Sequence, residues 1–140
     1  MDLPQLSSLT KKFDIELNGD DELFEQIRLE ISEKLFTFSE KIIEPIIVGS
    51  DSYSSLFEQD MLSRKERQGL FNLYKKIQVL KWENNLLMMK PSDKKTGEWI
   101  SSVWSLWNNE LEQEVTKICK KLSASWSDLK FKEDKIRYLG

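Results

Sequence analysis

The chain has 140 residues, 39% of them hydrophobic and 32% charged, with five Gly, three Pro and a net charge of −3. This length suits a single domain, 1–140, that needs neither a disulfide nor a metal to hold its fold. Histidine is absent, which excludes an imidazole general base, a His-activated nucleophile and any His-containing metal site. Few helix breakers and many charges favour long amphipathic helices, so we expect an all-α protein.

The lone cysteine, Cys119, excludes an internal disulfide. Without a histidine to activate it, we expect a small buried side chain at the edge of a helix face. The first residues show no basic start followed by an apolar run, and no window holds eighteen consecutive apolar residues. We therefore expect a soluble, cytoplasmic protein with no membrane segment and no cofactor.

Residues 1–18 are predicted to form an N-terminal arm, followed by a first long helix over residues 20–47. Pro45 and Gly49 predict that this helix kinks or ends between residues 44 and 49. Its hydrophobic residues fall on two nearly opposite stripes. The expected core stripe is Phe24, Ile27, Ile31, Leu35, Phe38 and Ile42. The second stripe is Leu29, Phe36, Ile43 and Ile47.

A short crossover helix is predicted over residues 52–60, capped by Asp51 and holding Leu56, Phe57 and Met61 against the other helices.

The second long helix is predicted over residues 63–90, where Ser63 and Glu66 have the spacing of a capping box and Pro91 prevents continuation. Its expected core stripe is Leu70, Leu73, Tyr74, Ile77, Leu80, Leu87 and Met88. Asn84 falls in that stripe, either as a polar residue that fixes helix register or as an edge position in contact with water. The opposite side carries a second apolar stripe, which consists of Phe71, Val79, Trp82 and Leu86. A helix that is apolar on two sides is covered on both, or binds something.

The third long helix is predicted over residues 93–125, and a basic tail follows over residues 127–140. Its expected core stripe is Ile100, Val103, Trp104, Trp107, Leu111, Val115, Ile118, Leu122 and Trp126. Trp99 and Leu106 lie off that stripe, and Trp is enriched in the hot spots of protein interfaces. Together these patterns predict a bundle of three long antiparallel helices with a short crossover helix and small terminal elements.

Charge is segregated by helix. Residues 1–62 contain 14 acidic and 5 basic side chains, whereas residues 63–97 contain 9 basic and 3 acidic ones. One interpretation is that the acidic first helix lies beside the basic second helix and neutralises it. The alternative is nucleic-acid binding, in which cations neutralise phosphates and exposed aromatic rings stack on bases. The residues for such contacts are Arg64, Lys65, Lys75, Lys76, Lys130, Lys132, Lys135 and Arg137.

The paired carboxylates of Glu22, Glu25, Glu30 and Glu33 resemble one half of a magnesium site in a helical bundle, but no second acidic pair follows and they fall off the core stripe. We therefore expect a solvated face and no enzymatic activity.

The resulting hypothesis is a non-catalytic protein-interaction module, acting as a subunit or adaptor of a larger assembly or through self-association. The expected interface residues are Leu29, Phe36, Ile43, Ile47, Phe71, Val79, Trp82, Leu86, Trp99 and Leu106. Nucleic-acid binding by the basic face of the second helix and the tail is the alternative.

Overall fold

The computed structural model describes residues 23–49 and 52–129. Helices hold almost all of this part of the chain and no strand occurs in it, which confirms the all-α class. The predicted arm 1–18, the cap Asp51 and the tail cations from Lys130 onward lie outside the described residues. Within the described ranges, no helix combines the length and hydropathy that crossing a bilayer requires.

The first long helix consists of α2 (Leu23–Phe38), the π-helix η1 (Ser39–Ile43) and α3 (Glu44–Ile47). Pro45 has no amide proton and would crowd the carbonyl group four residues earlier in a regular α-helix. The helix widens instead: the backbone amide of Glu44 donates to the carbonyl oxygen of Ser39, five residues back. Gly49 then takes a φ of 83°, which confirms the predicted left-handed stop.

The π turn changes which side of this helix faces the core. A wider turn holds one extra residue, so side chains after it shift by one position relative to a regular helix. Ile43, predicted for the second stripe, is therefore fully buried, whereas Ile42, predicted for the core, is 38% exposed. Phe24 at the start of the predicted core stripe is also exposed.

The short helix α4 (Tyr53–Met61) follows, and the Ser52 hydroxyl caps it by accepting from the amide of Ser55 at 3.3 Å. Phe57 packs edge-on against the ring of Trp126, with 5.9 Å between ring centroids. Leu56 is 51% exposed, so the prediction that it packs against the other helices is wrong.

The helix α5 (Arg64–Met89) begins at the predicted capping box. The amide of Ser63 donates to the Glu66 carboxylate at 2.9 Å, and the amide of Glu66 donates to the Ser63 hydroxyl at 3.1 Å. Most of the predicted core stripe is buried, but Met88 is 57% exposed, which corrects its assignment. The buried apolar residues of α5 are Leu70, Leu73, Ile77, Leu80 and Leu87.

The third long helix consists of α6 (Asp93–Leu106), the π-helix η2 (Trp107–Leu111) and α7 (Glu112–Asp128). It ends three residues later than predicted, so residues 127 and 128 are helical and not part of a tail. A second π turn, closed by the amide of Glu112 donating to the carbonyl of Trp107, again shifts the buried face. The buried apolar series is Trp99, Ile100, Val103, Leu106, Leu111, Val115, Ile118 and Leu122, in which the step from Leu106 to Leu111 spans the π turn.

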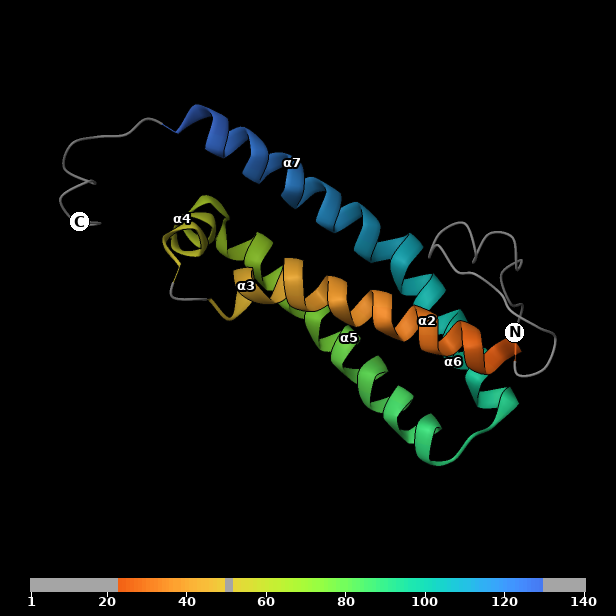
Figure 1. Cartoon of the computed structure of the whole chain (residues 1–140). Helices are drawn as coiled ribbons and strands as arrows, with labels where there is room; N and C mark the ends of the chain where they lie inside the picture. Colours follow the sequence, from red (N-terminus) through yellow and green to blue (C-terminus); the bar gives the residue numbers. More distant parts are fainter. Residues whose placement is uncertain (1–22, 50–51, 130–140) are drawn as a thin grey trace.

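Figure 1 shows how these helices are arranged. The first long helix runs one way and α5 returns beside it. The third long helix begins with α6, which passes next to α2, and continues as α7, which points away from the C-terminal end of α5. The α2 helix packs on both α5 and α6, while α4 lies near α3 and α7 at the opposite end of the molecule. The core lies between the first long helix, α5 and the third long helix, and it includes the place where α2, α5 and α6 meet.

Two groups of hydrogen bonds hold α2 and α6 against α5. Arg28 of α2 is fully buried, and its guanidinium group donates to the side-chain oxygen of Asn84 on α5 and to the Glu25 carboxylate. The Ser32 hydroxyl lies 3.0 Å from the same Asn84 oxygen. One turn away on the same inner side of α5, the indole N–H of Trp99 donates to the carbonyl of Leu80 at 2.9 Å. Asn84 is thus a buried register residue and not a water-facing edge position.

Substitution of Asn84 by Leu tests this register role. We expect Asn84→Leu to lower the free energy of unfolding by about 3 kcal/mol, because it leaves the buried Arg28 guanidinium without one of its acceptors. The matched control is Asn85→Leu, one position along α5 and half-buried, which should cost less than about 1 kcal/mol. Urea unfolding followed by circular dichroism measures both. Equal small decreases in the free energy of unfolding of the two variants would contradict the register role of Asn84.

Candidate functional site

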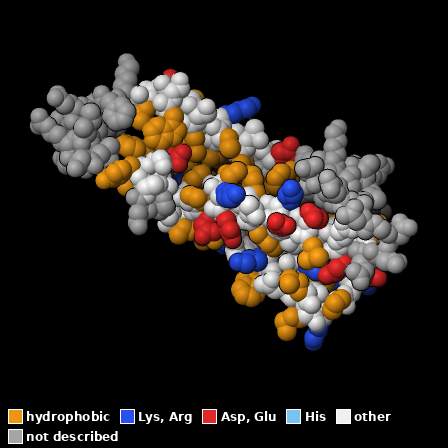
Figure 2. All heavy atoms as spheres, in the orientation of Figure 1, with side chains coloured by type: hydrophobic (Ala, Val, Ile, Leu, Met, Phe, Trp, Pro, Cys, Tyr) orange, Lys and Arg blue, Asp and Glu red, His pale blue; other side chains and the backbone are white. Residues whose placement is uncertain are grey.

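The outer side of α5 carries an exposed row of large apolar side chains, here called the α5 apolar face: Phe71, Val79, Trp82, Leu86 and Met89. Their exposed fractions are 40%, 57%, 67%, 56% and 81%. Figure 2 shows hydrophobic side chains gathered over the part of the molecule where α5 approaches its C-terminal end. Single exposed apolar residues are common on soluble proteins, whereas a row of this kind along one side of a helix is a candidate interaction surface.

The row is continuous because its members recur at helical spacing. Steps of seven residues from Val79 to Leu86 and from Trp82 to Met89 return to the same side of a helix turning 3.6 residues at a time. From Phe71 to Met89 the face extends for about 27 Å at 1.5 Å per residue. The Lys75 ammonium group lies 5.5 Å from the centre of the Phe71 ring, so this cation already contacts an aromatic face.

The other predicted interface residues divide into three groups. Leu29 on α2 is 48% exposed, and its role as an interface residue stays a prediction. Phe36 and Ile47 are partly buried against the core. Ile43, Trp99 and Leu106 are buried, at 0%, 2% and 6% exposure, so their assignment to a free surface was wrong. The first π turn explains the error for Ile43. Leu106 was misassigned because the stripe predicted from the residues after the second π turn does not continue unshifted into α6. The hydrogen bond to Leu80 explains why Trp99 lies inward.

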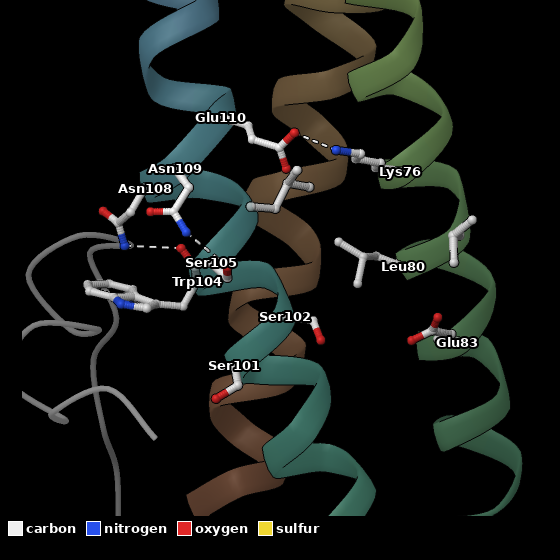
Figure 3. Close-up of a pocket in the computed structure, with 12 residues that line it drawn as sticks. Lys76, Leu80, Glu83, Ser101, Ser102, Trp104, Ser105, Asn108, Asn109 and Glu110 are labelled. Atoms are coloured by element: carbon white, nitrogen blue, oxygen red, sulfur yellow. Dashed lines mark hydrogen bonds and ion pairs between the residues drawn. The ribbon is translucent and has the colours of Figure 1, made fainter. Parts of the chain in front are cut away.

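A groove runs beside the α5 apolar face, between α5 and the α6–η2 segment (Figure 3). It has a volume of about 780 Å³, and Val79 and Leu80 of α5 lie across from Trp104 and Leu106 of α6. Lys76 on α5 and Glu110 on η2 form an ion pair across it. Leu80 and Leu106 form its apolar floor.

The polar walls of this groove are largely occupied by bonds within their own helix. The Ser102 hydroxyl donates to the Glu98 carbonyl at 3.0 Å, and the Asn109 amide donates to the Ser105 hydroxyl at 3.1 Å. The Asn108 amide likewise donates to the Trp104 carbonyl at 3.0 Å. Because these groups are already bonded, the groove offers shape and apolar contact more than a specific polar binding set.

The basic residues of α5 do not form an uninterrupted positive strip. Arg64 and Lys65 are exposed, but the groove that they line also contains Glu66 and Glu114. Among the described residues, the ion pairs of α5 with another helix are Lys76 with Glu110 and Glu66 with Lys121. Both join α5 to the third long helix. The first long helix packs beside α5 as expected, and its neutralisation of the α5 cations stays a prediction.

Glu66 is the residue of this region with the most altered acidity. A hydrogen bond from Lys121 and a second one from the Ser63 amide lower the pKa of Glu66 from 4.5 to about 2. Both partners favour the ionised carboxylate. The capping box therefore stays charged over the whole range in which proteins are normally handled.

A second apolar patch was missed from the sequence. It lies at the opposite end of the molecule, where Figure 2 shows another group of hydrophobic side chains near α4 and the end of α7. Its members are Val48, Tyr53 and Leu56, with exposed fractions of 66%, 56% and 51%, beside Trp126 at 37%. Leu56 and Trp126 were assigned to the core because helical periodicity identifies a face but not whether another helix reaches it. The indole of Trp126 donates to Glu58, so this ring is partly held in place.

Catalytic groups do not converge on either surface. No three His, Cys, Asp or Glu side chains in the described part of the chain are placed to hold a metal ion. Cys119 is exposed on α7, which corrects the expectation that it is buried. Glu25, expected on a solvated face, instead binds the buried Arg28.

The sequence matches no protein-family model, no curated protein and no solved structure.

Replacement of Glu66 by Ala tests the capping box and its pH dependence. At pH 7 we expect Glu66→Ala to lower the free energy of unfolding by about 1 kcal/mol. A carboxylate with a lowered pKa stabilises the fold fully above its unfolded value of 4.5. That stabilisation is lost as the pH falls toward about 2, so the difference between variant and parent should shrink over this interval. Urea titrations at several pH values measure it.

The control for this experiment is Glu83→Ala, because Glu83 is an exposed carboxylate on the same helix that takes no part in the cap. The capping box would not be the source of the pH-dependent stability in either of two cases. One is a loss of unfolding free energy in Glu66→Ala that does not change with pH. The other is the same pH dependence in Glu83→Ala.

Proposed function

We propose that this protein is a non-catalytic protein-interaction module that binds a protein partner through the α5 apolar face. The observation that carries the proposal is the exposure of Trp82, 67%, at the middle of a row whose other members are also exposed. Large aromatic side chains at the centre of an apolar patch dominate the free energy of many protein interfaces. A module of this kind acts as a subunit or adaptor of a larger assembly.

The surroundings of Trp82 support this role. The face lies on a helix of 26 residues whose other side is fixed in the core by Asn84 and Leu80, so the apolar row is presented on a rigid element. A rigid surface loses little conformational entropy on binding. We also infer that the chain folds as the predicted bundle of three long antiparallel helices with α4 as crossover, and that it acts inside the cell.

Nucleic-acid binding through the basic side of α5 is the second proposal. Exposed Arg64 and Lys65 favour it, as does the aromatic ring of Phe71 beside Lys75. Two features count against it: Lys76 is paired with Glu110, and Glu66 and Glu114 line the same groove as Arg64. Carboxylates among the cations weaken the attraction for phosphates. Protein binding is therefore the better-supported function.

A photo-crosslinker tests protein binding directly. Benzoylphenylalanine replaces Trp82 in one variant and the exposed Thr116 of α7 in the control, each made in cells that naturally contain this protein. We expect a protein adduct from position 82 and none from position 116, because only the first lies on the α5 apolar face. Adding Val79→Ser and Leu86→Ser should remove the adduct, since both changes take apolar contact from the same face.

An adduct of equal yield from both positions, or none from position 82, would rule out the α5 apolar face as a protein-binding surface.

Oligonucleotide titration tests the second proposal. We expect no saturable binding of fluorescent single-stranded or duplex oligonucleotides at low micromolar protein and low salt, because Lys76 is paired with Glu110 and the groove lined by Arg64 also contains Glu66 and Glu114. Fluorescence anisotropy measures it. Binding that weakens steeply with added salt, and that is lost in Arg64→Glu with Lys65→Glu, would instead support nucleic acid as the partner.

A further inference from the structure

The α5 apolar face has the dimensions of one half of a symmetric interface. With about 200 Å² for each whole side chain, the exposed fractions of its five members correspond to roughly 600 Å² of apolar surface. The stems of Lys75 and Gln78 lie among these residues and add to the area. Standard interfaces bury about 800 Å² on each partner, so one copy of the face nearly suffices for one side of a stable contact.

The charges around the face favour one orientation of a second copy. Lys75 is the cation within the row, near its N-terminal end, while the segment from Trp82 to Met89 is apolar along the row. If two α5 helices packed in parallel about a two-fold axis, Lys75 would lie next to its own counterpart. In an antiparallel pair, Lys75 lies instead toward the C-terminal half of the opposite α5, where the helix dipole is negative.

A flanking pair of opposite charges gives the register. Lys76 and Glu83 lie seven residues apart, on the flank of α5 that borders the groove shown in Figure 3. In an antiparallel pair with the two-fold axis between Val79 and Leu80, Glu83 of each copy lies opposite Lys76 of the other, whose ammonium group is then shared between this Glu83 and Glu110 of its own chain. This contact occurs twice. The same axis brings Val79 of each copy next to Trp82 of the other and Phe71 next to Met89. The contact between the Met89 sulfur and the Phe71 ring is favourable, because sulfur atoms pack well against aromatic rings.

We propose that a second copy of this chain covers the α5 apolar face, with the two α5 helices antiparallel across a two-fold axis between Val79 and Leu80. This inference rests on the proposed function, because it assigns the partner of the same surface. The groove beside α5 leaves room for the flanking side chains of the second copy. Each copy provides the same residues, so the contact closes as a dimer and does not extend into a filament.

Light scattering and sedimentation equilibrium test the assembly. The full chain is expected to show twice the mass of one chain at micromolar concentration. Trp82→Glu should raise the dissociation constant of the dimer by roughly 30-fold or more, because it places a charge at the centre of the face. Thr116→Glu on α7 is the matched control and should leave the dimer intact. Helix content by circular dichroism confirms that both variants are folded.

Disulfide trapping tests the orientation. In a Cys119→Ser background, Val79→Cys should give a covalent dimer on mild oxidation, because position 79 lies beside the two-fold axis. Phe71→Cys should give none, since the two copies of position 71 lie about 25 Å apart along antiparallel helices. A covalent dimer from Phe71→Cys but not from Val79→Cys would overturn the antiparallel arrangement.

The outcomes also separate this inference from the function on which it rests. Interfaces of standard size have dissociation constants of roughly micromolar or below, so a chain that remains monomeric at about 50 micromolar overturns the second copy as occupant. If the crosslinker at position 82 still captures a different protein, the interaction function stands without the dimer. If the chain is monomeric and position 82 gives no adduct, both the dimer and the function fail.

Discussion

Arg28 brings a full charge into the centre of the protein, and the packing of the long helices depends on how that charge is accommodated. Its guanidinium group donates to Asn84 on α5 and to Glu25 on its own helix, while Ser32 shares the same Asn84 oxygen. A buried charge is tolerated only where acceptors meet it, so α2 and α5 can pack in one register and not in one shifted by a turn. The hydrogen bond from Trp99 to Leu80 places α6 against the same part of α5.

This constraint determines which side of α5 remains outside. Asn84 and Leu80 both lie on the inner side, and once they are engaged the opposite side of the same helix faces away from α2 and α6. Trp82 and Leu86 are therefore exposed although they are as hydrophobic as the residues of the core. The inner side of α5 is apolar apart from Asn84, so the apolar outer row makes this helix apolar on two sides, and the outer row is a candidate for contact with another protein.

Composition and local sequence patterns were sufficient to predict the all-α class, the capping box at Ser63 and the stop at Gly49, because each depends on residue types or on residues close together in the sequence. The amphipathic periodicity also predicted that Phe71, Val79, Trp82 and Leu86 share one side of α5. What it missed depends on tertiary structure. Pro45 suggested a kink, but a π turn preserved the helix and moved Ile43 into the core. The second π turn, at Trp107–Leu111, has no comparable sequence signal and aligns Leu111 with Leu106 on the buried side, whereas a regular helix would align Leu111 with Trp107. Arg28 was overlooked because a charged residue is assigned to the surface unless its partners are known.

The most direct measurement of the central claim compares the two sides of α5 by thiol reactivity. In a Cys119→Ser background at nanomolar concentration, Leu86→Cys reports on the outer side, where the parent residue is 56% exposed, and Ile77→Cys reports on the inner side, where it is fully buried. We expect the thiol at position 86 to react at least ~100-fold faster than the thiol at position 77, which becomes accessible only when the core opens. Similar rates at the two positions would contradict the account, because they would show that α5 does not have one side fixed in the core and the other open to a partner.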